Sequence, residues 1–260
     1  MDANRTRFVL TRPDLQFGIV TSVLVIVAHA FAYMTHEYSH TFVAWALGWM
    51  PHPLALDYGK PTLYNILFLG DVGDNVDYAP IFAAGSGISV AAIALAGTFL
   101  GNGLLYFVLY LLAGMKAVAS SRWALSMTYW VALMCAGNVW GYVPIRAITT
   151  HADIAIAARG LHLSVWALCP FLLIPSLWIT WHFFERMMAR CVALVAGGEA
   201  THLALVIVLT SYWFFAFFGG DGTDGSYGLV SQLLAIGSKY FLFPVSAMYL
   251  SARYRLPAEA

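Results

Sequence analysis

Charged residues are scarce in this chain of 260 residues. Aspartate and glutamate together number 13, lysine and arginine also number 13, and the four types make up 10% of the sequence. In soluble domains these four types usually make up about 25% of the residues, so the composition excludes an ordinary soluble domain. The formal net charge of zero offers no basic surface, and we therefore expect no nucleic-acid partner.

Cysteine is equally scarce. Cys135, Cys169 and Cys191 lie far apart, in or near apolar segments, and form no CxxC pair. They provide neither a disulfide framework nor a cysteine-based metal site, and they do not indicate a cellular compartment.

Apolar residues, in contrast, make up 61% of the chain, and the mean hydropathy is +0.75. This composition is typical of a polytopic membrane protein. The apolar segments cover about residues 17–49, 80–115, 122–143, 162–183, 201–218 and 227–250. A spanning helix needs about 20 residues, so we predict an all-α protein with about six transmembrane helices in a lipid bilayer. We expect residues 1–160 to form the core, and residues 161–260 to add helices to the same membrane domain.

The distribution of basic residues predicts the topology. The first apolar segment is too long for the core of a cleaved signal peptide, so an uncleaved signal-anchor helix is expected. With six crossings, most basic residues fall on one side, which the positive-inside rule makes cytoplasmic. Both termini are then cytoplasmic, whereas Arg146 and Arg159 fall on the opposite side. The residues that set the orientation are Arg5, Arg7, Arg12, Lys116, Arg122, Arg186, Arg190, Arg253 and Arg255.

Two regions leave alternatives open. Residues 80–115 could form two short helices broken at the glycine-rich stretch 97–103, but we favour one tilted or kinked helix. The polar stretch 51–78 carries aromatic and branched residues at 62–69 between turn signals. That pattern predicts a short β element near the membrane surface, with a plain surface loop as the alternative.

The most informative stretch is His36-Glu37-Tyr38-Ser39-His40, an HExxH motif inside the first apolar segment. Residues four apart share one helix face, so His36 and His40 can offer two imidazoles to one Zn²⁺. Glu37 then lies beside the metal and can accept a proton from a bound water, as the catalytic base. Ionisable residues inside a membrane are costly and tend to mark function, which strengthens the indication.

A catalytic zinc site usually needs a third protein ligand. We favour Asp153, because a carboxylate after the third apolar segment reaches the HExxH level if the second segment crosses once. Asp153 could instead cap the helix that follows it, and His151 competes for the ligand role. His29 shares a helix face with His36 and lies about 10 Å from it along the axis. It could act as a proton relay, or it could be a packed histidine that bonds to a neighbouring helix.

At this point the chain resembles the intramembrane zinc metalloproteases of the site-2 protease class. In that family HExxH is followed by a small residue and then a glycine at intervals of four, matched here by Ala44 and Gly48. The two small residues would leave a thin helix face that another helix can approach. Residues 83–87 are similar to the small-residue entrance of the next core helix.

The order of Asn138, Pro144 and Asp153 also resembles the asparagine-proline-aspartate segment of the family. In this chain the three residues lie farther apart, and Ile154 replaces the glycine that usually follows the aspartate. The resemblance covers about residues 17–160.

The resemblance implies a three-helix metalloprotease core with Zn²⁺ held by His36, His40 and Asp153. It also implies Glu37 as the catalytic base and Asn138 as a substrate-binding residue. The expected reaction is hydrolysis of a peptide bond in a transmembrane protein, which must unwind locally because a helix hides its carbonyls. The residues leave two alternatives open, a membrane zinc hydrolase of non-peptide substrates and an inactive scaffold or accessory subunit. Substrate identity and oligomeric state are not indicated.

Overall fold

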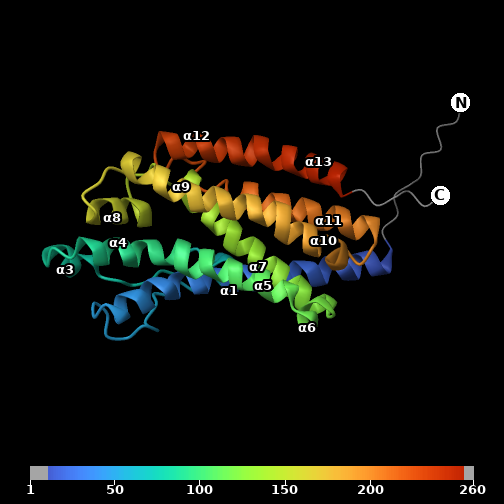
Figure 1. Cartoon of the computed structure of the whole chain (residues 1–260), viewed down its shortest axis with the longest axis horizontal. Coiled ribbons are helices and arrows are strands. Elements are labelled where there is room, and N and C mark those ends of the chain that lie inside the picture. Colours follow the sequence, from blue (N-terminus) through green and yellow to red (C-terminus); the bar gives the residue numbers. More distant parts are fainter. Residues whose placement is uncertain (1–10, 255–260) are drawn as a thin grey trace, which may run out of the picture.

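The computed structural model describes residues 11–254, and its helices run mostly along one common direction (Figure 1). Within this range there is no strand, and one isolated antiparallel bridge joins Asp57 and Gly73. The predicted all-α architecture is therefore confirmed, and the predicted β element is wrong.

Helix α1 (Arg12–Ala46) has 35 residues and carries the HExxH motif. A capping box fixes its start, because the Thr11 hydroxyl accepts from the N–H of Asp14 while the Asp14 carboxylate accepts from the N–H of Thr11. At 1.5 Å per residue the helix measures about 52 Å, which exceeds the roughly 30 Å hydrocarbon core. The helix begins at Arg12, before the expected boundary at residue 17. Because of its length, it extends beyond the hydrocarbon.

The loop after α1 contains helix α2 (Leu63–Phe68) where the sequence suggested a strand. Thr62 caps this helix by accepting from the N–H of Asn65. The buried Asn65 amide then ties the loop together, because it donates to the carbonyl of Tyr58 and accepts from the N–H of Asp71. These local side-chain bonds favour a helical turn over extended pairing.

Residues 78–114 form a short helix and a long one. Helix α3 (Tyr78–Ala83) is separate, and Gly85, at φ +69°, makes the turn that follows it. Helix α4 (Gly87–Leu95), the π-helical η1 (Ala96–Leu104) and α5 (Leu105–Gly114) then form one continuous helix. The glycine-rich stretch thus changes the helix type without interrupting the helix, as the single-helix alternative requires.

Helix α7 (Arg122–Trp140) lies at the centre of the bundle, after the short α6 (Lys116–Ala119). Of its 19 residues, 15 are buried, and it packs against α1, α5, α10 and η4. A π-helical turn, η2 (Gly141–Ile145), continues it, and extended backbone at Val143 breaks the helix there.

The remaining helices are α8 (Ala152–Gly160), α9 (Val165–His182), η3 (Phe183–Met187), α10 (Met188–Ala196), α11 (Ala200–Ser211), η4 (Tyr212–Phe218), α12 (Leu229–Gly237), η5 (Ser238–Leu242) and α13 (Phe243–Arg253). The stretch α9–η3–α10 is continuous, so the helix expected to end at residue 183 extends to Ala196. Arg186 and Arg190 consequently lie inside that helix and not after it.

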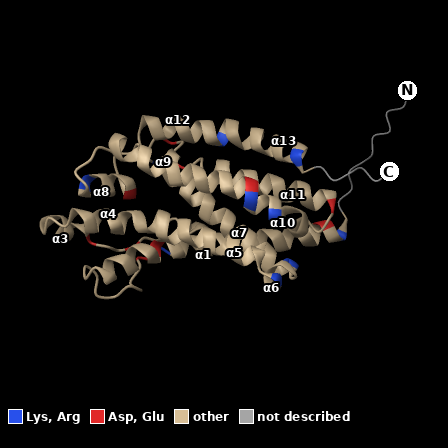
Figure 2. Ribbon diagram, in the orientation of Figure 1, with Lys and Arg blue, Asp and Glu red and all other residues tan. Residues whose placement is uncertain are grey.

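Five helical stretches in the described range are long and apolar enough to cross a membrane: Arg12–Ala46, Gly87–Gly114, Val165–Ala196, Ala200–Phe218 and Leu229–Arg253. They correspond to five of the six expected spans and carry few charges (Figure 2), which supports a multi-pass membrane protein. The expected span over 122–143 forms the central α7, whose neighbours are mainly other helices. The start of α1 and the end of α13 lie at the same end of the bundle (Figure 1). That this end is cytoplasmic stays a prediction, and Arg5, Arg7 and Arg255 lie outside the described residues.

Candidate metal centre

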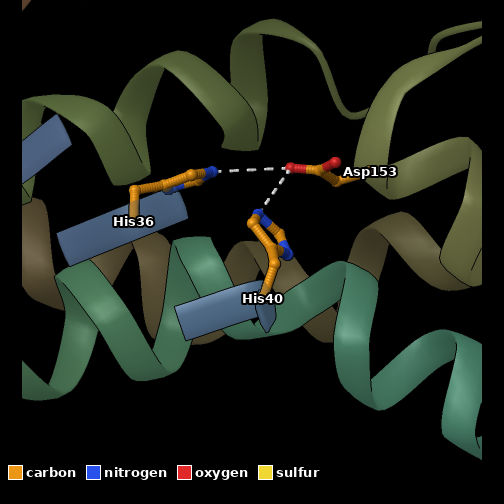
Figure 3. Close-up of side chains that lie close together, drawn as sticks. All are labelled: His36, His40 and Asp153. Carbon is orange, nitrogen blue, oxygen red and sulfur yellow. Dashed lines mark ion pairs between the residues drawn. The ribbon is translucent and has the colours of Figure 1, made fainter. Parts of the chain in front are cut away.

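His36 and His40 lie one turn apart on the buried face of α1, and each is 1% exposed. Helix α8 brings Asp153 to them, and the three side chains point toward one another (Figure 3). Oδ2 of Asp153 lies 3.6 Å from Nε2 of His36 and 3.5 Å from Nε2 of His40. One ligand atom from each residue falls within a 4.8 Å group, so the three side chains could hold a metal ion.

The free polar atoms of this group fit a cation. Nε2 of His36 and Oδ2 of Asp153 are buried without a hydrogen-bond partner among the described residues. Buried polar atoms are normally paired, so these two need a partner. Ligands of a tetrahedral zinc, about 2 Å from the metal, lie roughly 3.4 Å from each other, close to the distances from Asp153 to the two imidazoles.

The structure separates Asp153 from the alternatives. His151 occupies the N-cap position of α8, so the reading of Asp153 as the helix cap is wrong. The ring of His151 stacks on Tyr227, with centroids 4.8 Å apart, and does not join the group. Burial opposes ionisation of Asp153, but the adjacent imidazoles of His40 and His36 outweigh it and hold the pKa of this carboxyl below its usual value.

Small residues let α8 approach closely enough to deliver Asp153. A Cβ built on Gly160 would lie 2.7 Å from the carbonyl oxygen of Gly87, and one built on Gly87 would collide with the carbonyl of Gly160. Helices α4 and α8 therefore touch backbone to backbone at these two glycines. Sequence reasoning found Gly87 only as part of a small-residue stretch.

The second ring nitrogen of each histidine is also held. Nδ1 of His40 lies 2.7 Å from the carbonyl oxygen of Ile93, to which it must donate, and this leaves Nε2 free as a ligand. Nδ1 of His36 lies 3.1 Å from the amide nitrogen of Asn102, while the amide oxygen of Asn102 is buried and has no partner within the described range. The two amide orientations have the same shape, and a half turn lets the oxygen accept from Nδ1–H of His36. Asn102 belongs to no sequence motif that would indicate a role beside a metal ligand.

The backbone of η1 packs directly against the two imidazoles. A Cβ built on Gly97 would collide with Nε2 of both His36 and His40. Only glycine therefore leaves room for an ion between the imidazoles at this position. The sequence identified residues 97–103 as a possible helix break and gave no sign of this contact.

The small residues after HExxH have different roles. Ala44 is fully buried and packs with Ile81, Val90 and Ile93, in agreement with the predicted close approach of another helix. Gly48 lies beyond the end of α1, at φ +80° and with open space around the position of a Cβ. Its predicted role in thinning the helix face is wrong, because its left-handed backbone instead ends the helix.

Glu37, which is 8% exposed, lines a cavity of about 460 Å³. His36 and Asn138 line the same cavity, so the predicted substrate-binding residue and the predicted base share it. Much of the wall comes from the C-terminal half of the chain, through Phe217, Phe218, Asp221, Tyr227 and Lys239. No motif in the sequence indicates a site role for that half.

A further carboxylate lies beside His40. Oδ2 of Asp74 is 4.0 Å from Nδ1 of His40 and 3.5 Å from the hydroxyl of Tyr78, which donates to it. Burial raises the pKa of Asp74 above its ordinary value. Asp74 therefore contributes to the polar surroundings of His40 from the loop before α3.

The other histidines in membrane helices have separate partners. His29 bonds to the carbonyl of Phe68 at 3.1 Å and is surrounded by aromatic rings, as the packed-histidine alternative predicts. His182 bonds to the hydroxyl of Tyr106, and His202 lies 3.3 Å from Asp14. None of the three belongs to the group around Asp153.

Comparison with known proteins gives no match: no protein-family model matches this chain, and neither does a curated protein or a solved structure.

Proposed function

We propose that this protein is an intramembrane zinc metalloprotease, similar to the site-2 protease class, that hydrolyses a peptide bond in a transmembrane substrate. One observation carries the proposal: the HExxH glutamate and His36 line the same cavity, and His36 also belongs to the group of potential ligands with His40 and Asp153. Two imidazoles and a carboxylate favour zinc, with a fourth position left for water.

The roles of the residues follow from their positions. When bound, Zn²⁺ supplies a polarised water whose pKa is lowered toward neutrality. Glu37, on the cavity side, would accept a proton from the attacking water and later return it to the leaving amine. Asn138 faces the same cavity, where its amide can donate to the carbonyl oxygen of the peptide bond under attack.

The size of the cavity favours an unwound substrate. An α-helix with its side chains is about 10 Å across, and an intact helix would not enter a space of about 460 Å³. Its carbonyls are also occupied by internal hydrogen bonds. A short extended segment with a few side chains fits both conditions.

The proposal predicts different effects for the base and for the third ligand. Glu37→Gln should retain about one zinc per chain and lower cleavage of a model transmembrane peptide by about 100-fold or more, because the base is lost and the ligands remain. Asp153→Ala should lose zinc, whereas His151→Ala, two residues away, should keep it. Zinc content by elemental analysis and cleavage of the peptide with and without chelator measure both.

Two outcomes would contradict the proposal in different ways. Zinc in the wild type without cleavage of any transmembrane peptide would favour a hydrolase of non-peptide substrates. Absence of zinc from correctly folded protein would favour a scaffold or accessory subunit.

A further inference from the structure

The cavity beside Glu37 contains two basic side chains, Arg146 and Lys239, that the proposed chemistry does not use. They come from different parts of the bundle, since Arg146 follows η2 and Lys239 lies in η5. Basic residues in apolar surroundings are costly, and they usually have a specific partner or a function.

Lys239 lies well inside an apolar span. It is about 15 Å along the helix from Leu229, within the stretch Leu229–Arg253 that is apolar enough to cross a membrane. Its ammonium makes no ion pair or hydrogen bond with the described residues, and lies 5.5 Å from the ring centroid of the exposed Tyr240. All three N–H donors of Lys239 therefore lack an acceptor among residues 11–254.

Arg146 is held firmly but is only partly paired. Its Nε donates to the carbonyl of Gly141, and its Nη1 donates to the hydroxyl of Tyr227 and lies 2.8 Å from the carboxylate of Asp221. The guanidinium also lies 4.0 Å from the ring centroid of Tyr142. Nη2 makes no hydrogen bond with the described residues, so its two N–H groups are the donors of this oriented guanidinium that lack a partner there.

We propose that the cavity binds a carboxylate of the peptide substrate through Lys239 and Nη2 of Arg146. The inference rests on the proposed function, because it names the substrate class of the same site. Nη1 of Arg146 stays paired with Asp221, while Nη2 can donate to a second carboxylate and Lys239 supplies the unpaired charge. The aromatic walls and limited volume fit a few peptide residues better than a two-chain lipid.

The carboxylate could come from an acidic side chain or from a free C-terminus. Binding of fluorescent apolar peptides to purified Glu37→Gln protein separates the two, because that variant should not cleave them. One peptide pair differs by glutamate against glutamine, and a second pair differs by a free C-terminus against a C-terminal amide. We expect one acid form to bind about 10- to 100-fold more tightly than its amide, as for hydrogen bonds to charged groups.

Variants of Lys239 then test the assignment. Adding Lys239→Gln should reduce the preference to about twofold or less, and Lys239→Arg should retain it because the charge remains. Lys116→Gln, in the exposed α6, is the matched control and should leave the preference unchanged. Arg146→Gln should weaken the preference too, and Arg146→Lys should restore only part of it because the planar fork is lost.

Equal binding of acid and amide in both pairs would overturn the inference, as would a preference that persists without both basic side chains. Displacement of the peptides by dodecyl phosphate, with no discrimination between acid and amide, would assign the cavity to phosphate and overturn it too. Cleavage by the wild type separates this inference from the proposed function. If the wild type cleaves peptides but the cavity does not prefer the acid forms, only the carboxylate-binding inference is wrong. If the acid forms bind preferentially but no peptide is cleaved, only the protease proposal is wrong.

Discussion

At the scale of single residues, each histidine of the candidate centre uses its two ring nitrogens differently. Nε2 of His36 and of His40 faces Asp153, while each Nδ1 faces a polar group on the neighbouring helix. A hydrogen bond from Nδ1 fixes the tautomer and the ring orientation that a metal requires at Nε2. For His40 the acceptor is a backbone carbonyl, which no substitution removes. For His36 it is the side chain of Asn102, which can be changed.

Asn102→Leu should therefore lower zinc affinity by about 10- to 100-fold, the usual cost of losing such a hydrogen-bond partner of a metal ligand. Leucine keeps the volume but removes the acceptor. Asn102→Asp restores an acceptor and should recover zinc affinity to at least the wild-type value. Competition with a chromogenic chelator measures the affinity in each variant.

Thr98→Val provides the matched control for this test. Thr98 is fully buried in the same π-helical segment, and its hydroxyl has no partner among the described residues. Its loss should leave zinc affinity within about twofold of the wild type. If the leucine and valine variants bind zinc equally, Asn102 does not orient His36.

The sequence identified some of these residues and not others for a physical reason. His36, Glu37 and His40 follow from helical spacing alone, because one element sets their relation. Asp153 could be proposed only through an assumed topology, which left His151 as an alternative. Asn102 reaches His36 across a contact between helices, and Lys239 reaches the cavity through the packing of the last helices. No spacing along the chain encodes either position.

At the scale of elements, η1 decides how closely the second long helix approaches α1. A Cβ on Gly101 would lie 2.6 Å from the Ser39 hydroxyl and 2.9 Å from the Thr35 carbonyl, and Gly97 lies directly under the two imidazoles. The glycines four apart thus serve close helix packing, as small residues do in membranes. From the sequence alone they also leave a helix break open as an alternative, because glycine weakens a helix. Contact with α1 resolves that conflict.

Gly97→Ala should remove zinc binding, because the added methyl group occupies the space between the ligand atoms. Gly103→Ala is the matched control in the same element, since its Cβ would meet its nearest atoms at 3.5 Å, an ordinary contact. Zinc content is measured in the monodisperse fraction after size exclusion, so that only folded protein of the two variants is compared. Zinc retained in the Gly97 variant would place the ion elsewhere.

At the scale of the whole molecule, the candidate centre joins parts of the chain that are distant in sequence. His36 and His40 come from α1, and Asp153 comes from α8 after two intervening long helices. The cavity wall adds η4, the loop after it and η5. The resemblance over residues 17–160 could not indicate that wall, because the packing of the last helices follows from burial along whole faces and not from a motif.

A metal that links α1 to α8 should stabilise the whole bundle. Ligand binding to the folded state alone adds about 2.7 kcal/mol when free zinc is 100-fold above its Kd. For a protein of this size, 1 kcal/mol corresponds to about 2–4 °C, so chelation should lower the Tm by several degrees. Glu37→Gln should show the same shift because all three ligands remain, and Asp153→Ala should show none. Thermal unfolding in detergent, with and without chelator, measures the shift. A wild-type Tm that is indifferent to chelation, or an Asp153→Ala variant that responds like the wild type, would mean that no metal joins these two helices.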